Sequence, residues 1–141
     1  MPAETPTDAL ESRPAEDQQA GRAEWIAAVE KIADDAEAWA TEQKWFVHRG
    51  PKEITEPGLG TYEVPTVLIQ APAGRFVIDP IARYVIGAEG RLDFCVFPSY
   101  YYLMVLRTEA GWQVETNPRT TARPWSKQTF FEVISELARM A

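Results

Sequence analysis

Hydrophobic residues recur at two different periods along the chain, and the change of period separates a helical part from a sheet-forming part. Between about residues 22 and 45, apolar residues are spaced three and four apart from Trp25 to Ala40, while acidic residues occupy the other faces. This pattern predicts a long amphipathic helix. From Val64 onward, apolar residues alternate with more polar ones, which is typical of half-buried β-strands.

Turn-like sequences rich in glycine and proline divide the second part into short strands. These separators are too short for parallel crossovers, so we expect antiparallel neighbours. Pro80 predicts a bulge or a bend between the second and third strands. The expected strands lie at about residues 64–70, 75–79, 82–86, 91–97, 100–108 and 112–116.

The strand expected at 100–108 is apolar at both odd and even positions. Side chains of a strand point alternately to the two faces of a sheet. The composition of this strand therefore indicates a central position that is covered on both faces.

A second helix is indicated near the end of the chain. Ser126 is a favourable N-cap, and Trp125 before it is placed to pack on Phe130 as a hydrophobic staple. The buried stripe of this helix is predicted to contain Phe130, Val133, Ile134 and Leu137. We therefore expect an α+β fold in which an N-terminal helix precedes an antiparallel β-meander of about five to six strands, and a C-terminal helix packs on one sheet face.

The 141 residues suffice for one domain. Residues 1–20 contain three prolines, many small or charged residues and, after Met1, a single large aliphatic residue, Leu10. Such a segment buries too little apolar surface to offset its ordering entropy. We predict a disordered acidic tail at residues 1–20 and a single α+β domain at residues 21–141.

Charge is distributed unevenly between these parts. The whole chain has 21 acidic and 14 basic residues, for a net charge of −7. Residues 1–42 contain 11 acidic and 3 basic residues (net −8), whereas residues 43–141 contain 10 acidic and 11 basic residues (net +1). The overall negative charge argues against nucleic acid or an anionic membrane as the main partner.

Several classes of site lack their characteristic residues. One cysteine, Cys95, and one histidine, His48, provide few soft metal ligands, and the chain has no phosphate-binding glycine loop and no Gly-x-Ser-x-Gly motif. We therefore assign no catalytic residue, no metal ligand and no cofactor. The single cysteine favours the reducing cytoplasm, no apolar run has the length of a membrane span, and the acidic first 22 residues do not resemble a targeting peptide.

Charged residues on the predicted strands form the strongest candidate for a ligand site. Arg75 and Asp79 share one face of a strand, and Arg91 and Asp93 share a face of another, with Arg83 and Glu89 close in sequence. Carboxylates grouped in this way suit Mg²⁺, and arginines suit a phosphate or carboxylate. The alternative interpretation, which we favour, is a solvent-facing sheet whose opposite charges pair across strands.

Three consecutive tyrosines, Tyr100, Tyr101 and Tyr102, form a second candidate. In a strand, Tyr100 and Tyr102 would share a face and offer a stacking platform for bases or sugars, although packing in the core or at an interface is the commoner role. The basic stretch at residues 117–127 is a third candidate, either as a site for an acidic segment or as an ordered loop leading into the last helix.

These patterns favour a non-catalytic accessory or protein-binding domain, with a protein partner or self-association as a homodimer. One alternative is a metal- or anion-dependent enzyme that uses Asp79, Glu89 and Asp93 with Arg75, Arg83 or Arg91. A second alternative is a single-stranded nucleic-acid binder that uses Tyr100, Tyr102 and the arginines.

Overall fold

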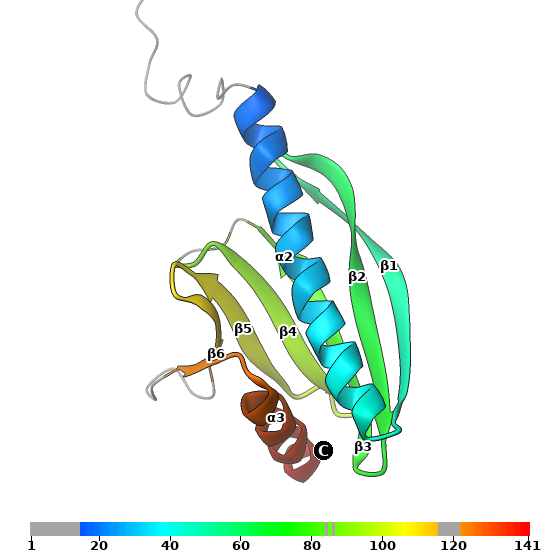
Figure 1. The fold of residues 1–141 in the computed structure, drawn as a ribbon. Helices are drawn as coiled ribbons and strands as arrows, with labels where there is room; N and C mark the ends of the chain where they lie inside the picture. Colours follow the sequence, from blue (N-terminus) through cyan, green and yellow to red (C-terminus); the bar gives the residue numbers. More distant parts are fainter. Residues whose placement is uncertain (1–14, 84, 86, 116–121) are drawn as a thin grey trace, which may run out of the picture.

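The computed structural model describes residues 15–83, 85, 87–115 and 122–141 of the chain. Two helices, α2 (Ala15–Glu42) and α3 (Lys127–Met140), precede and follow seven strands. The strands are β1 (Phe46–Glu56), β2 (Gly60–Ala71), β3 (Gly74–Ala82), β4 (Gly90–Phe97), β5 (Tyr102–Thr108), β6 (Gly111–Glu115) and β7 (Arg123–Pro124). All seven form one sheet in which each strand pairs antiparallel with the next (Figure 1).

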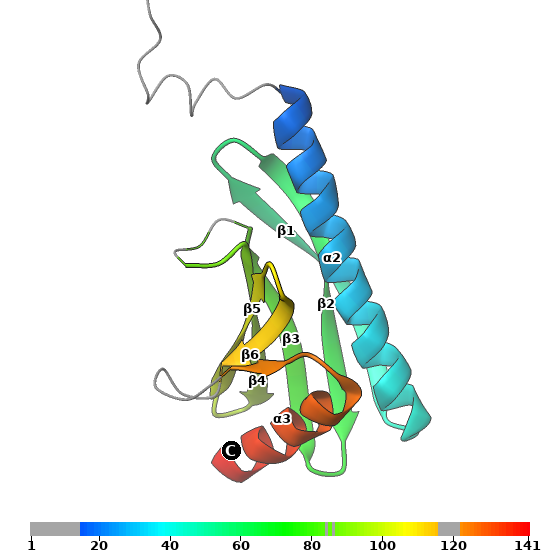
Figure 2. The same cartoon turned by 60° about the vertical axis from the view of Figure 1, so that its left-hand side comes forward.

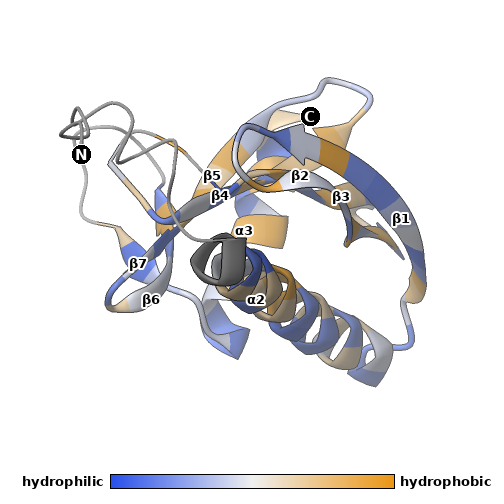
Figure 3. Cartoon of the chain, turned by 90° about the horizontal axis from the view of Figure 1, so that it is seen from above, coloured by the Kyte–Doolittle hydropathy of each residue, from blue (hydrophilic) through white to orange (hydrophobic). Residues whose placement is uncertain are grey.

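Both helices lie on the same face of this sheet, as the sequence predicts. Helix α2 contacts β1 and β2, while α3 contacts β4 and β5 (Figures 1 and 2). Seen along α2, the sheet curves around the two helices (Figure 3). The α+β prediction is therefore confirmed, with one more strand than the upper limit expected.

Apolar residues on the inner sides of the helices and the sheet form one core. Trp25 and Ile32 of α2 are buried, as are Phe94 of β4 and Phe130 of α3. At α3, Ser126 accepts a hydrogen bond from the backbone N–H of Thr129, and the Trp125 and Phe130 rings meet at 5.9 Å. The predicted cap, staple and buried stripe of this helix are all confirmed.

Strand β1, like the two-residue strand β7, is not revealed by the sequence pattern. The sequence Gly50-Pro51 is typical of a turn between two elements. Both residues nevertheless lie inside β1, and Pro51 lies opposite Pro65 of β2. A proline is tolerated here because β1 is at the edge of the sheet, where a missing N–H interrupts no ladder between two strands.

Helix α2 begins at Ala15, seven residues before the predicted start, so it includes six residues that were assigned to the tail. Residues 1–14, the rest of the predicted tail, lie outside the described residues. Neither helix, over the residues that the structure describes, has an apolar stretch as long as a membrane crossing requires.

Two predicted strand boundaries are wrong. The strand expected at 82–86 is replaced by a single bridge between Val85 and Ala88, although residues 84 and 86 lie outside the described set. The strand expected at 100–108 begins only at Tyr102, so Tyr100 lies in the β4–β5 turn, where its backbone φ is 63°. The bulge expected at Pro80 is present as a register shift between Pro80 and Ala82.

Candidate functional site

One face of the sheet has no helix over it in the described structure, and we call it the open face. Cross-strand neighbours place its side chains in four rows. The first row contains Phe46, Gln70, Arg75 and Phe97, and the second contains His48, Leu68, Val77, Cys95 and Tyr102. The third row contains Asp79, Asp93, Met104 and Glu115, and the fourth contains Arg91, Leu106 and Gln113.

Apolar side chains dominate part of this face. The second row crosses five strands, or about 19 Å at the usual strand spacing, and four of its five residues are Leu68, Val77, Cys95 and Tyr102. Tyr102 is 49% exposed, and the other three are half-buried by their neighbours in the sheet. The face is therefore richer in apolar side chains than a freely solvated sheet face normally is.

The apolar character of β5 has its explanation here. Leu103 and Val105 are buried toward the helices, whereas Met104 and Leu106 point to the open face and are half-buried. The expectation that both faces of this strand are covered is wrong for the described part of the chain, since the helices cover one face only.

The structure brings together the two predicted carboxylates. Asp79 and Asp93 are direct cross-strand partners, an arrangement that is repulsive for two charged carboxylates. Each is bound by a cation: Lys52 Nζ lies 2.7 Å from Asp79 Oδ1, and Arg91 binds Asp93 with contacts of 2.8 and 3.0 Å. Lys52 also donates to the carbonyl of Pro80 at 2.7 Å, so its ammonium group is held by two adjacent residues of β3.

Arg91 also connects this polar group to the aromatic part of the face. Its guanidinium lies 5.8 Å from the centre of the Tyr102 ring, within the range of a cation–π contact. Hydrogen bonding to Asp93 is the largest of the effects that raise the pKa of Arg91 above its ordinary value. Arg91, Asp93 and Tyr102 thus form one contiguous set, in which the Arg91–Asp93 ion pair lies within β4 rather than across two strands.

The remaining predicted site residues lie apart from this set. Arg75 is exposed at the other end of the face, opposite Phe97 and Gln70. Arg83 lies in the β3–β4 connection, where its guanidinium donates to the carbonyl of Glu89 at 2.8 Å. The six predicted site residues therefore do not all converge in one cleft.

Over the described residues, no group of three or more histidine, cysteine, aspartate or glutamate side chains is close enough to share a metal ion. Two hollows among the described residues have no predicted site residue in their lining. One, of about 690 Å³, lies beside α3 and includes Arg123, Phe131 and Arg139. The other, of about 300 Å³, lies between α2 and the β1–β2 hairpin and includes Arg49 and Pro65.

Cys95 lies in the middle of the second row of the open face. Burial raises the pKa of its thiol to about 11, and the charges of Asp93 and Asp79 add to this effect. Both effects disfavour the thiolate, so the surroundings of Cys95 suit packing in the sheet better than nucleophilic attack.

The free edge of β1 is a poor template for another strand. Thr66 Oγ1 donates to the carbonyl of Gly50, which therefore points toward β2. The Pro51–Pro65 pair, which has no N–H on either side, then occupies a non-hydrogen-bonded position. Pro51 accordingly interrupts the outward row of N–H groups at mid-strand, a common protection against edge pairing.

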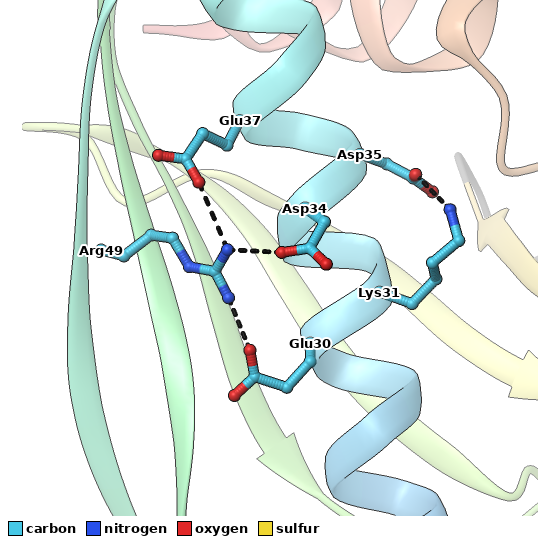
Figure 4. Close-up of polar contacts among 6 residues, drawn as sticks. All are labelled: Glu30, Lys31, Asp34, Asp35, Glu37 and Arg49. Atoms are coloured by element: carbon cyan, nitrogen blue, oxygen red, sulfur yellow. Dashed lines mark hydrogen bonds and ion pairs between the residues drawn. The ribbon is translucent and has the colours of Figure 1, made fainter.

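The acidic side of α2 is bound to the body of the protein. Arg49 of β1 contacts three carboxylates of this helix, Glu30 at 2.7 Å, Asp34 at 2.6 Å and Glu37 at 3.3 Å (Figure 4). The hydrogen bond to Asp34 is the main cause of the raised pKa of Arg49. Charges that look like a solvated face in the sequence therefore hold the helix to the edge strand.

Other cations repeat this arrangement along α2. Arg107 of β5 binds Glu24 at 2.7 Å, and Lys127 at the start of α3 binds Glu42 at 2.6 Å. Arg123 binds Glu132 of α3 at 3.1 Å. The part of the basic stretch that the structure describes thus pairs with acids of the two helices, while residues 117–121 lie outside it.

A buried polar network joins α2 to the far end of the β1–β2 hairpin. Trp25 Nε1 donates to the Tyr62 hydroxyl at 3.0 Å, and Tyr62 in turn donates to the carboxylate of Glu56. Glu56 is 7% exposed and also accepts from the backbone N–H of Arg83 at 3.0 Å. Burial, followed by the bond to Glu56, raises the pKa of Tyr62.

The sequence pattern singles out Asp79, Asp93, Arg91 and Tyr102 as candidates but not the apolar residues between them. Leu68 and Val77 belong to strands whose outward side was assigned to solvent, and only the two-sided pattern of β5 signalled an apolar outer face. Comparison of the chain with protein family models, curated proteins and solved structures finds no match.

Proposed function

We propose that this protein is a small non-catalytic domain that binds another protein through the open face of its sheet. The observation that carries the proposal is the apolar second row, which crosses five strands with no described element above it. Apolar surface that a fold leaves uncovered while it builds a complete core elsewhere is characteristic of interaction sites.

Two further features support binding by the face rather than by an edge. The long edge strand β1 is interrupted by Pro51, and the opposite edge strand, β7, has only two residues. Aromatic residues, which are enriched in protein interfaces, lie exposed at one end of the face: Phe46 at 57% and Tyr100 at 66%.

The pairing of the charged residues favours binding over catalysis. Asp79 and Asp93 are each bound by a cation of the same chain, so their carboxylates already have partners within the fold. A cytoplasmic location, expected from the single cysteine, belongs to the same proposal.

Site-specific photo-crosslinking in living cells tests this function. A photoreactive amino acid replaces Tyr102 on the open face and, as the control, Ala110 in the exposed β5–β6 turn. We expect the Tyr102 variant to give a covalent adduct with a different polypeptide that the Ala110 variant does not give. An adduct that nuclease removes would support nucleic-acid binding instead, and equal or absent adducts at both positions would contradict the proposal.

A further inference from the structure

Among the described residues, the cations of the open face are paired within the chain, with one exception in its apolar part. Lys52 binds Asp79 and Arg91 binds Asp93, but Arg75 is exposed and has no hydrogen bond or ion pair with any residue that the structure describes. The unpaired cation is therefore a property of one defined position, at the start of β3.

The residues around Arg75 would let it bind a charged group of a partner while apolar side chains of that partner contact the sheet beside it. It lies in the first row between Gln70 and Phe97, and Val77 of the second row is two residues further along the same strand. Phe97 contacts Tyr100 edge to face at 4.9 Å, which adds a second ring to this corner. A guanidinium flanked by aromatic and aliphatic groups suits a carboxylate that is carried by an apolar segment.

We infer that the polypeptide bound at the open face carries an aspartate or glutamate beside aliphatic or aromatic residues, and that Arg75 binds this carboxylate. The inference rests on the proposed function and adds the chemistry of the partner. The apolar side chains of the segment contact the second row, centred on Leu68 and Val77, and its carboxylate fixes the orientation.

The shape of the face favours such a segment over a second copy of this chain. The open face is the outer side of a sheet that curves around its helices (Figure 3). Two outward-curved faces meet over a limited area, whereas a stable interface needs about 1,200 Å² or more. A peptide segment or a single helix of a partner follows the curvature more easily.

Selection from a library of random displayed peptides tests the inference, with the full chain as bait. Peptides that bind the wild-type chain but not the double variant Leu68→Thr/Val77→Thr are face-dependent. These changes remove apolar contacts, and threonine is a β-branched residue that suits strands. We expect face-dependent peptides to be enriched in acidic residues next to apolar ones. Their binding should weaken at least about threefold with Arg75→Glu.

The sharpest readout is a reversal of charge in the selected peptides. With the Arg75→Glu bait, lysine or arginine should replace the acidic residue, whereas Arg139→Glu, at an exposed unpaired arginine on α3, should leave the acidic preference unchanged. Face-dependent peptides with no charge preference, or with a preference that Arg75→Glu leaves intact, would overturn the inference and leave the proposed function standing.

Two other outcomes bear on this inference and on the proposed function. A lack of face-dependent peptides would contradict both. A dimer in sedimentation experiments that Leu68→Thr/Val77→Thr dissociates would place a second copy on the face and overturn the inference about an acidic segment.

Discussion

Replacing Gly90 with alanine is expected to destabilise the fold, because the new methyl group would enter the space that Trp25 fills. A Cβ at this position would lie 2.2 Å from Cζ3 of Trp25 and 2.8 Å from two further ring atoms. Since carbon atoms in contact are normally about 3.5–4.0 Å apart, the indole would have to move by more than about 1 Å. The backbone of Gly90 has no positive φ, so the effect is steric.

The expected cost follows from what Trp25 contacts. Its side chain is fully buried, donates to Tyr62 at 3.0 Å and packs on Trp112 with ring centres 5.8 Å apart. Overpacking a core costs about 1–3 kcal/mol, and a weakened hydrogen bond adds about 0.5–1.5 kcal/mol. We therefore expect Gly90→Ala to lower the free energy of unfolding by about 2–4 kcal/mol.

Urea denaturation followed by circular dichroism measures this change. Gly21→Ala is the matched control, because a Cβ at Gly21 of α2 meets nothing within 4 Å and alanine favours the helix by about 0.5–1 kcal/mol. In a double-mutant cycle with Trp25→Leu, the added methyl group should be much less costly, since the smaller side chain leaves room for it. A Gly90→Ala protein as stable as the wild type, or an additive cycle, would refute the proposed packing.

Three further perturbations test the electrostatic and polar contacts. Arg49→Ala removes a cation that contacts three carboxylates of α2; it should cost about 1 kcal/mol in urea denaturation at low salt and less at high salt, and a salt-independent loss would contradict the ionic origin. For Cys95, with a thiol pKa of about 11 against an ordinary 9.0, the alkylation rate should keep rising with pH up to about 11. Between pH 9 and 11 the unfolded chain loses this proton while the folded chain keeps it, so the free energy of unfolding should fall as pH rises, and less steeply in Cys95→Ala; an alkylation rate that levels off near pH 9 would refute the assignment. Glu56→Gln should cost about 1–3 kcal/mol because an amide cannot replace both acceptor oxygens beside Tyr62 and Arg83, and unchanged thermal stability would show that the network contributes little.

Elements with strong local signals could be predicted from the sequence, and those that depend on partners could not. Helix α3 carries its cap, staple and stripe within residues 125–137, so its structure follows from adjacent residues. Strand β1 contains Gly50-Pro51, which locally reads as a break, and it is a strand because β2 pairs with it along its whole length. Only the position of β1 at the sheet edge makes its proline acceptable.

The candidate site divides in the same way. The Arg91–Asp93 pair could be expected, because residues two apart on a strand share a face. The Lys52–Asp79 pair could not be expected, because the two residues are 27 positions apart in the chain and Lys52 belongs to β1, a strand that the sequence does not predict. The apolar second row exists only in the register that places Leu68 beside Val77 and Val77 beside Cys95.

The most direct test of the central claim is the affinity of the open face for the polypeptide crosslinked at Tyr102. Binding is measured by calorimetry with the wild-type chain, with Leu68→Thr/Val77→Thr and with the control Ala110→Asp, after circular dichroism has shown that all three are folded. We expect the double variant to bind at least about tenfold more weakly, because two apolar contacts are lost, and Ala110→Asp to bind like the wild type. Equal affinity for all three proteins would show that the open face is not the binding surface.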